Sequence, residues 1–148
     1  MKKTILIGLA IICILSMGML TACQRQEQTA QEKIETLRHQ FDNIRIEINK
    51  QIAEGPEDIK EQLRLLNEEP LVTKIDALNK IILEIKELQE DVEEVDRADY
   101  NFLCARLMYE YNEVKELKEA YENYDKMTDR EKFLLDMKIQ VIRELVNN

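Results

Sequence analysis

The 148-residue chain has few of the residues that most catalytic and cofactor sites require. His39 is its only histidine, so a zinc site built from several histidines cannot form within one chain. Ser16 is its only serine, and beyond residue 22 no serine remains to serve as a nucleophile. Phosphate-binding loops need several glycines, whereas Gly55 is the single glycine beyond residue 22. The sequence therefore predicts a protein that is not an enzyme and holds no cofactor.

Turn-forming residues are equally scarce. Beyond residue 22 the glycines and prolines are Gly55, Pro56 and Pro70, whereas β-structure normally needs turn residues about every 8–12 positions. Helix formers such as Glu, Lys, Leu, Gln and Arg dominate instead. We therefore predict one all-α domain over residues 30–148. Because short connections place consecutive helices side by side in opposite directions, we expect an antiparallel up-and-down helical bundle with coiled-coil-like packing.

Apolar spacing and capping signals predict helices over residues 30–53, 57–66, 71–96, 99–124 and 129–146. Thr29 and Glu32 have the spacing of a capping box, and Thr128 and Glu131 repeat it before the last helix. The first helix carries a single apolar stripe with steps of three and four, formed by Ala30, Ile34, Leu37, Phe41, Ile44, Ile48 and Ile52. In the last helix the residues expected to face inward are Leu134, Met137, Val141 and Leu145.

The helix boundaries depend on a few residues. Gly55 is expected to end the first helix in a left-handed or cap conformation, and Pro56 suits the first position of the second helix. The next boundary is ambiguous, because residues 96–99 contain neither glycine nor proline. An unbroken helix over 71–124 would be about 80 Å long at ~1.5 Å per residue. The shorter helices could not cover it, so we expect a break, with Asp99 capping the fourth helix.

The fourth predicted helix has apolar residues on two sides. One face carries Tyr100, Leu103, Leu107, Tyr111, Val114 and Tyr121. Phe102 and Tyr109 lie on the opposite side. A helix that is apolar on two sides usually packs between two neighbours, so we expect both rings to be buried. The alternative is that Phe102 and Tyr109 form an interface with a protein partner, because exposed tyrosine is common in such interfaces.

Other reactive or charged residues have structural explanations. Cys104 lies in an amphipathic stretch and is expected to be buried, with a raised thiol pKa; an intermolecular disulfide is the alternative. His39 falls off the apolar stripe and is expected at the surface. We interpret the acidic run as a solvated helix face without a metal, since it lacks the Asp-x-Asp-x-Asp-Gly loop of calcium sites; weak cation binding is the alternative. This run comprises Glu87, Glu90, Asp91, Glu93, Glu94, Asp96 and Asp99.

The beginning of the chain has the features of a secretory signal. Lys2 and Lys3 precede a charge-free stretch over residues 4–24 that ends in small residues. Within it, Leu20-Thr21-Ala22-Cys23 resembles the lipobox of bacterial lipoproteins. The resemblance implies that residues 1–22 are a cleaved signal peptide and that Cys23 carries diacylglycerol. An uncleaved signal anchor is the alternative, because about 20 apolar residues can span a bilayer.

Both alternatives place residues 24–148 outside the cytoplasm, because the basic start of such a segment prefers the inner side. The lipoprotein alternative predicts attachment to the cell membrane or outer membrane through lipid on Cys23. Residues 23–29 would then form a short tether to the first helix. The formal net charge of −9 disfavours nucleic acid as a partner and opposes binding of the protein surface to anionic headgroups.

A second resemblance covers residues 121–135. Tyr124, Met127 and Thr128, followed by the acidic start of the last helix, are similar to the interhelical turn of small three-helix modules on Gram-positive surface proteins. Met127 stands where those modules have leucine. The resemblance implies a spacer or binding module.

Together these features predict a membrane-anchored extracytoplasmic lipoprotein that acts as a non-catalytic protein-interaction or envelope-structural module. The expected partners are the membrane, through Cys23, and another protein. The alternative is a small-ligand or peptide-binding protein with its site in the bundle core. Polar residues on an apolar stripe would indicate such a site, and the first helix has none on its stripe between Ile34 and Ile52.

Overall fold

The computed structural model describes residues 29–147 of the chain, and within them the fold is all-α. The helices are α2 (Ala30–Ala53), α3 (Ile59–Leu65), α4 (Leu71–Leu88), α5 (Arg97–Asn123) and α6 (Asp129–Asn147). Short 3-10 turns, η1 (Gln89–Asp91) and η2 (Tyr124–Lys126), follow α4 and α5. The predicted fold class is confirmed.

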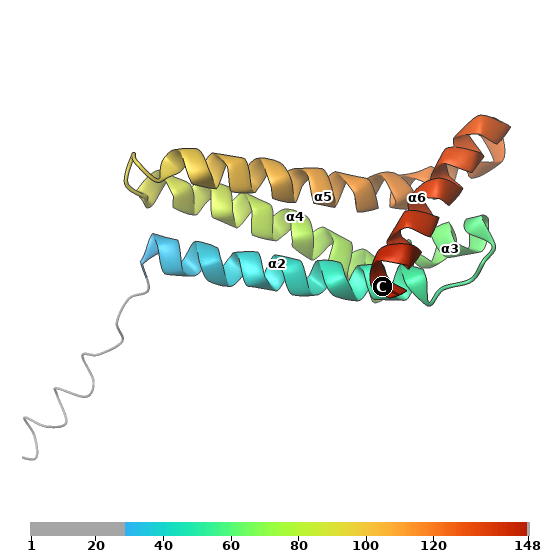
Figure 1. Ribbon diagram of the computed structural model, residues 1–148, viewed down its shortest axis with the longest axis horizontal. Helices are drawn as coiled ribbons and strands as arrows, with labels where there is room; N and C mark the ends of the chain where they lie inside the picture. Colours follow the sequence, from blue (N-terminus) through green and yellow to red (C-terminus); the bar gives the residue numbers. More distant parts are fainter. Residues whose placement is uncertain (1–28, 148) are drawn as a thin grey trace, which may run out of the picture.

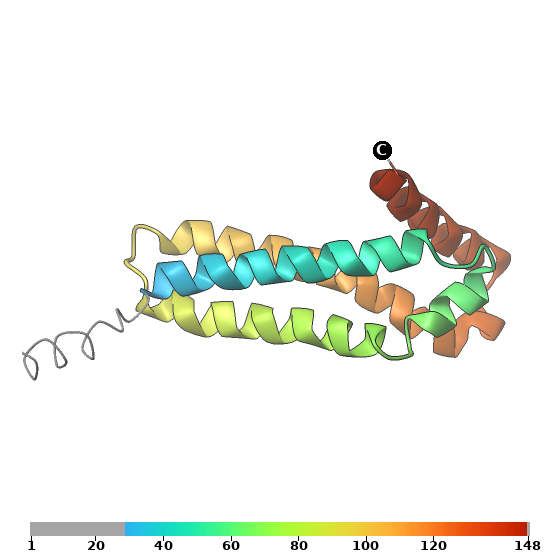
Figure 2. The ribbon, with the colours of Figure 1, turned by 90° about the horizontal axis from the view of Figure 1, so that it is seen from below.

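Three long helices form the body of the molecule. In two perpendicular views α2, α4 and α5 lie side by side and alternate in direction along the long axis (Figures 1 and 2). The short α3 and the oblique α6 lie at the end of the bundle where α2 finishes. The N-terminus of α2 and the connection between α4 and α5 lie at the opposite end, where the Gln31 side-chain amide donates to Asp96 Oδ2 at 2.7 Å.

The predicted capping box and apolar stripe of α2 are confirmed. Thr29 Oγ1 accepts from the Glu32 N–H at 3.2 Å, and Glu32 Oε2 accepts from the Thr29 N–H at 3.0 Å. These bonds satisfy backbone donors that a helix start leaves unpaired. From this start the 3–4 spacing turns one side of α2 to the interior, where Ile34, Leu37, Phe41, Ile48 and Ile52 are buried.

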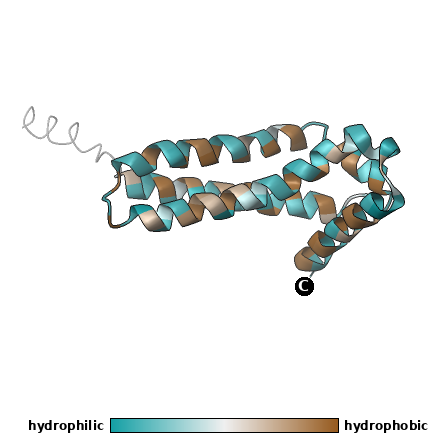
Figure 3. Cartoon of the chain, turned by 90° about the horizontal axis from the view of Figure 1, so that it is seen from above, coloured by the Kyte–Doolittle hydropathy of each residue, from teal (hydrophilic) through white to brown (hydrophobic). Residues whose placement is uncertain are grey.

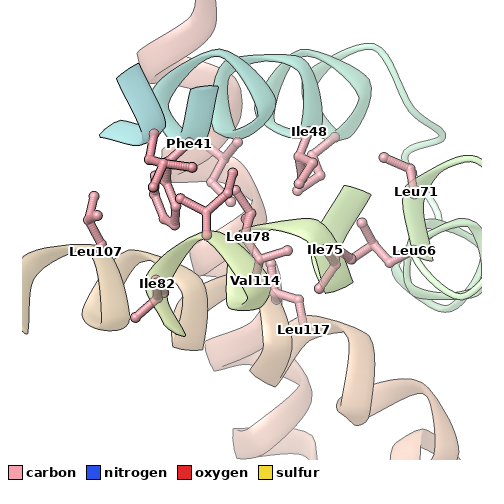
Figure 4. Close-up of a cluster of buried hydrophobic side chains, with 14 of the residues drawn as sticks. Phe41, Ile48, Leu66, Leu71, Ile75, Leu78, Ile82, Leu107, Val114 and Leu117 are labelled. Atoms are coloured by element: carbon pink, nitrogen blue, oxygen red, sulfur yellow. The ribbon is translucent and has the colours of Figure 1, made fainter. Parts of the chain in front are cut away.

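The core is a continuous apolar cluster between the long helices. Figure 4 shows Phe41 and Ile48 of α2 near Ile75, Leu78 and Ile82 of α4. Leu107, Val114 and Leu117 enter the same cluster from α5, and Leu66 and Leu71 close it near α3. Burial of these side chains is the main favourable term that holds the bundle together. None of the helices within residues 29–147 is both long enough and apolar enough to cross a bilayer.

The predicted conformations at the connection between α2 and α3 are wrong. Gly55 is not in the left-handed region, and Glu54 caps α2. The position is crowded instead, because a Cβ on Gly55 would lie 2.0 Å from Oε1 of the buried Gln62, whose side chain would have to shift. Pro56 does not open the next helix either. Asp58 does so, since its side chain accepts from the Glu61 N–H at 2.8 Å.

The break between α4 and α5 is confirmed, but its position differs from the prediction. The α-helix ends at Leu88 rather than near residue 96, and α5 begins at Arg97, so Asp99 lies in its first turn and does not cap it. Arg97 stabilises the observed connection. Its guanidinium donates to the carbonyl oxygens of Val92 at 3.2 Å and Glu90 at 3.1 Å, which satisfies acceptors that the broken helix leaves unpaired.

The predicted orientation of α6 is wrong, although its capping box between Thr128 and Glu131 is confirmed. The residues expected to face inward are exposed by about half or more: Leu134 52%, Met137 48%, Val141 49% and Leu145 72%. The buried side instead carries Ile139 and Ile142. The cause is the oblique path of α6, which contacts α2 along one side; Figure 3 shows it projecting from the bundle with many apolar residues.

Candidate functional site: an apolar groove between α5 and α6

Two neighbouring hollows, of about 410 and 490 Å³, lie between α5 and α6 and have Leu134 and Lys138 in common. We name their combined surface the α5–α6 groove. Its apolar lining consists of Tyr109, Leu117, Ala120, Met127, Leu134, Leu135, Met137, Val141, Ile142 and Leu145. Arg45 and Asn49 of α2 lie at one end of the groove. The groove exists because α6 is fixed to α2 and stays clear of much of α5.

A hydrogen bond from Arg143 helps to set the position of α6. The Arg143 guanidinium donates from Nη2 to the carbonyl oxygen of Pro56 at 2.5 Å, which joins α6 to the connection after α2. Ile139 and Ile142 lie on the buried side of the same helix. Because this side of α6 packs against the bundle, the groove is lined by an exposed apolar stripe, which consists of Leu134, Met137, Val141 and Leu145. Contiguous apolar residues on an accessible surface of this kind usually mark a binding site.

The α5 side of the groove includes one of the two aromatic residues for which burial was predicted. That prediction is wrong, because Phe102 is 76% exposed and Tyr109 is 66% exposed. Among the described helices, α5 contacts mainly α3 and α4, which leaves Phe102 and Tyr109 on its outer face. Tyr109 lines the groove, and its hydroxyl lies 3.3 Å from Glu113 Oε1. Phe102 lies two helical turns away and outside the groove.

Carboxylates dominate the charged rim of the groove. The acids are Glu113, Glu116, Glu119 and Glu131, and the bases are Arg45 and Lys138. Lys138 Nζ lies 2.6 Å from Glu116 Oε2, so part of this charge is neutralised within the site. The pKa of Glu131 lies below its usual value because its carboxylate accepts hydrogen bonds from Thr128, which keeps it ionised at neutral pH.

Arg45 is a partly buried charge at one end of the groove. Burial lowers the pKa of this guanidinium, while the negative charges of Glu110 and Glu113 act in the opposite direction. Because the ordinary pKa of arginine is so high, Arg45 remains a cation. Its Nη1 donates to Asn49 Oδ1 at 2.5 Å, one turn along α2. Arg45 is therefore held in place by its own helix.

The lipidation site predicted from the lipobox, Cys23, lies outside the described residues, as do the signal peptide over 1–22 and most of the tether over 23–29. Cys104 is buried, as predicted, and burial raises the pKa of its thiol. Its Sγ lies 3.6 Å from Gln89 Oε1. A buried thiol with a raised pKa is a weak nucleophile, so Cys104 acts as a small core residue.

His39 is exposed, as predicted, and its Nε2 lies 3.3 Å from Glu35 Oε1. The acidic run was predicted to lie on a helix face but spans the end of α4, η1, the connection to α5 and the first turn of α5. Among residues 29–147, no three side chains of His, Cys, Asp or Glu are grouped in a way that could hold a metal ion. The interior, where a small-ligand site was the alternative, contains Gln62 as the single buried polar residue of the described chain.

Sequence reasoning did not identify the groove. Arg45 and Lys138 were not among the candidate residues, and the α6 stripe was assigned to the core. One signal was available, because Glu113, Glu116 and Glu119 recur every three residues beside the apolar face of α5. The searches of protein-family models, curated proteins and solved structures found no match to this chain.

Proposed function

We propose that the protein is a membrane-anchored extracytoplasmic lipoprotein that acts as a non-catalytic protein-interaction module. The observation that carries this proposal is the α5–α6 groove, whose apolar stripe on α6 is exposed by between 48% and 72%. Exposing such a stripe to water is unfavourable, and a protein that covers it would gain free energy from apolar burial. The lipobox-like sequence ending at Cys23 supports the anchored location.

The position of the groove suits an anchored protein that contacts a partner. Thr29 follows Cys23 by six positions, a stretch that spans at most about 20 Å when extended. Arg45, at one end of the groove, follows the start of α2 by 15 residues, which is about 22 Å along a helix. The tether would therefore join α2 at its start, whereas the groove lies toward the other end of that helix. A partner in the envelope could reach the groove while the lipid stays in the bilayer.

The anchor is tested by metabolic labelling with a fatty-acid probe in a bacterial host. The full chain is expected to incorporate the probe into the membrane fraction. A Cys23→Ala variant should lose the label and accumulate as the uncleaved precursor. A Cys13→Ala variant is the matched control, because Cys13 lies within the same apolar stretch. Label that persists in Cys23→Ala would contradict lipid attachment at this residue.

The contact role is tested by photo-crosslinking in intact membranes. A photoreactive residue at Met137 or Val141 is expected to form a discrete adduct with another protein. Leu83 provides the control, because it is a half-exposed apolar residue of α4 outside the groove. Absence of any adduct at Met137 and Val141, or the same adducts at Leu83, would contradict a specific role for the groove.

A further inference from the structure

We infer that the α5–α6 groove binds a basic amphipathic helix of a partner protein. This inference rests on the proposed function, in which the groove is a protein-contact surface, and adds the shape and charge of the segment that occupies it. Three features of the groove carry it. They are the length of the apolar stripe, the wall formed by α5, and the excess of carboxylates on the rim.

The apolar stripe has the dimensions of a helix-binding surface. From Leu134 to Leu145 it extends over about three helical turns, or roughly 16 Å. Its side chains recur every three to four residues, which matches the spacing of apolar residues on one face of a partner helix. On the α5 side, Tyr109 and Leu117 form a wall beside this stripe. A single helix laid along the groove would contact both helices.

The charged rim favours a cationic occupant. Four carboxylates line the groove, and the cations that line it are Arg45 and Lys138. Lys138 already pairs with Glu116 at 2.6 Å, and Glu110 and Glu113 lie close enough to Arg45 to affect its pKa. Lys115, outside the groove, pairs with Glu119 at 3.4 Å across the helix surface, where such pairs are weak. The rim thus stays anionic and would attract lysine or arginine on the partner helix.

A second copy of this chain is a poorer occupant. Each copy carries a formal net charge of −9, so two grooves brought together would place carboxylates opposite carboxylates. The α6 helix, which would have to be shared, contains equal numbers of acidic and basic residues and supplies no excess positive charge. Charge complementarity therefore favours a different, basic protein segment over self-association.

The inference is tested by fluorescence anisotropy with the full chain in phosphatidylcholine nanodiscs and empty nanodiscs as the blank. The probe is a labelled helical peptide of about 15 residues, roughly 22 Å long, with leucine on one face and lysine on the other. A second peptide has glutamate in place of lysine, and a third has serine in place of leucine. The lysine peptide is expected to bind, and both others to bind at least about tenfold more weakly, because each lacks one of the two complementary features.

Variants of the chain locate the binding site. A Met137→Ser, Val141→Ser double variant should lose most of the affinity for the lysine peptide, whereas Leu83→Ser on α4 should leave it unchanged. A Glu113→Gln, Glu119→Gln double variant should weaken binding of the lysine peptide and reduce its dependence on salt. Circular dichroism melting of each variant shows whether the bundle is still folded, since these residues lie at the surface and not in the core.

The possible contradicting results are distinguishable. Equal binding of the lysine and glutamate peptides would overturn the inferred charge preference. Failure of the lysine peptide to bind, with adducts still forming at Met137 in membranes, would overturn the basic helix and leave the protein-contact role standing. A dimer in sedimentation that the Met137→Ser, Val141→Ser variant abolishes would show that a second copy is the occupant. Failure of both peptide binding and crosslinking would contradict the proposed function as well.

Discussion

Lys138 of α6 and Glu116 of α5 form an ion pair across the α5–α6 groove, with Nζ and Oε2 separated by 2.6 Å. The two side chains are 41% and 62% exposed, and solvent-exposed pairs of this kind contribute at most about 1 kcal/mol. The pair alone therefore cannot hold α6 against α5. The buried side of α6 and the bond from Arg143 to Pro56 attach the helix to the bundle instead. This one-sided attachment leaves the groove open.

Removing the ion pair should have a small effect. We expect Lys138→Met to change the free energy of unfolding by no more than about 1 kcal/mol, because water and salt screen the two charges. Denaturation by urea at low and high salt measures this change. A loss of several kcal/mol would show that α5 and α6 are closed on each other in solution.

The two sides of α6 should respond differently to truncation. Ile139 is 1% exposed, so Ile139→Ala should cost about 2–5 kcal/mol of unfolding free energy through lost burial and a cavity. Met137→Ala should stay within about 0.5 kcal/mol, because the side chain is already half in water. Thermal or urea unfolding of these two variants decides between the two orientations of α6. A larger cost for Met137→Ala would mean that the helix is turned as the sequence pattern first indicated.

Phe102 and Tyr109 should also tolerate truncation. Each ring is more than half exposed, so Phe102→Ala and Tyr109→Ala are expected to change stability by about 0.5 kcal/mol or less. Phe41→Ala is the control, because that ring is fully buried and its loss should cost about 3–5 kcal/mol. Of these two aromatic residues, Tyr109 lines the groove and Phe102 does not. Tyr109→Ala should therefore weaken partner binding, whereas Phe102→Ala should not. Equal loss of binding in the two variants would show that the interface extends beyond the groove.

The contact between Gly55 and Gln62 gives a test of the α2–α3 connection. A Cβ on Gly55 would overlap the buried Gln62 amide, so Gly55→Ala should cost about 1–3 kcal/mol as an overpacked site. In a Gln62→Ala background the overlap is absent, and the same substitution should then be nearly neutral. Urea unfolding of the parent, the two single variants and the double variant completes this double-mutant cycle. Additive effects would show that the two residues do not meet.

The capping box of α6 should make stability depend on pH. Hydrogen bonds from Thr128 lower the pKa of Glu131 in the folded protein. A depressed folded-state pKa contributes stability above the unfolded value, near pH 4.5, and this contribution is lost as the pH falls through the folded value. Melting between neutral and acidic pH should therefore show a smaller acid destabilisation for Glu131→Gln than for the parent protein. Glu57→Gln, at another exposed carboxylate, should retain the parent's profile.

The sequence predicted those features of the fold that depend on residues close together in the chain. Thr29 with Glu32, and Thr128 with Glu131, fix helix starts through bonds spanning three residues. The buried stripe of α2 could also be predicted, because its apolar residues occupy one side of the helix. In α6, apolar residues occur on more than one side, and periodicity cannot say which side meets a neighbour. Ile139 and Ile142 are buried because of where α6 crosses α2, which is a long-range relationship.

The same limit explains the candidate site. The anchoring residue was proposed from a local motif at Cys23, whereas the groove depends on the position of α6 relative to α5. Gly55 is a smaller example, because a glycine in the sequence does not show which neighbour limits the space at its position. That neighbour is the Gln62 amide, seven residues further along the chain. Aromatic residues such as Phe102 likewise gave no indication of whether a described helix would cover them.

The most direct test of the groove as a helix-binding site uses the methionines as probes. Met127 and Met137 line the groove, whereas Met108 lines a separate hollow with Lys86 and Cys104. The measurement is methyl NMR of the full chain labelled at methionine and titrated with the lysine-rich amphipathic peptide. The account predicts shifts of the Met127 and Met137 methyl signals while that of Met108 stays in place. A shift of Met108 equal to that of Met137, or no shift of any of the three, would contradict it.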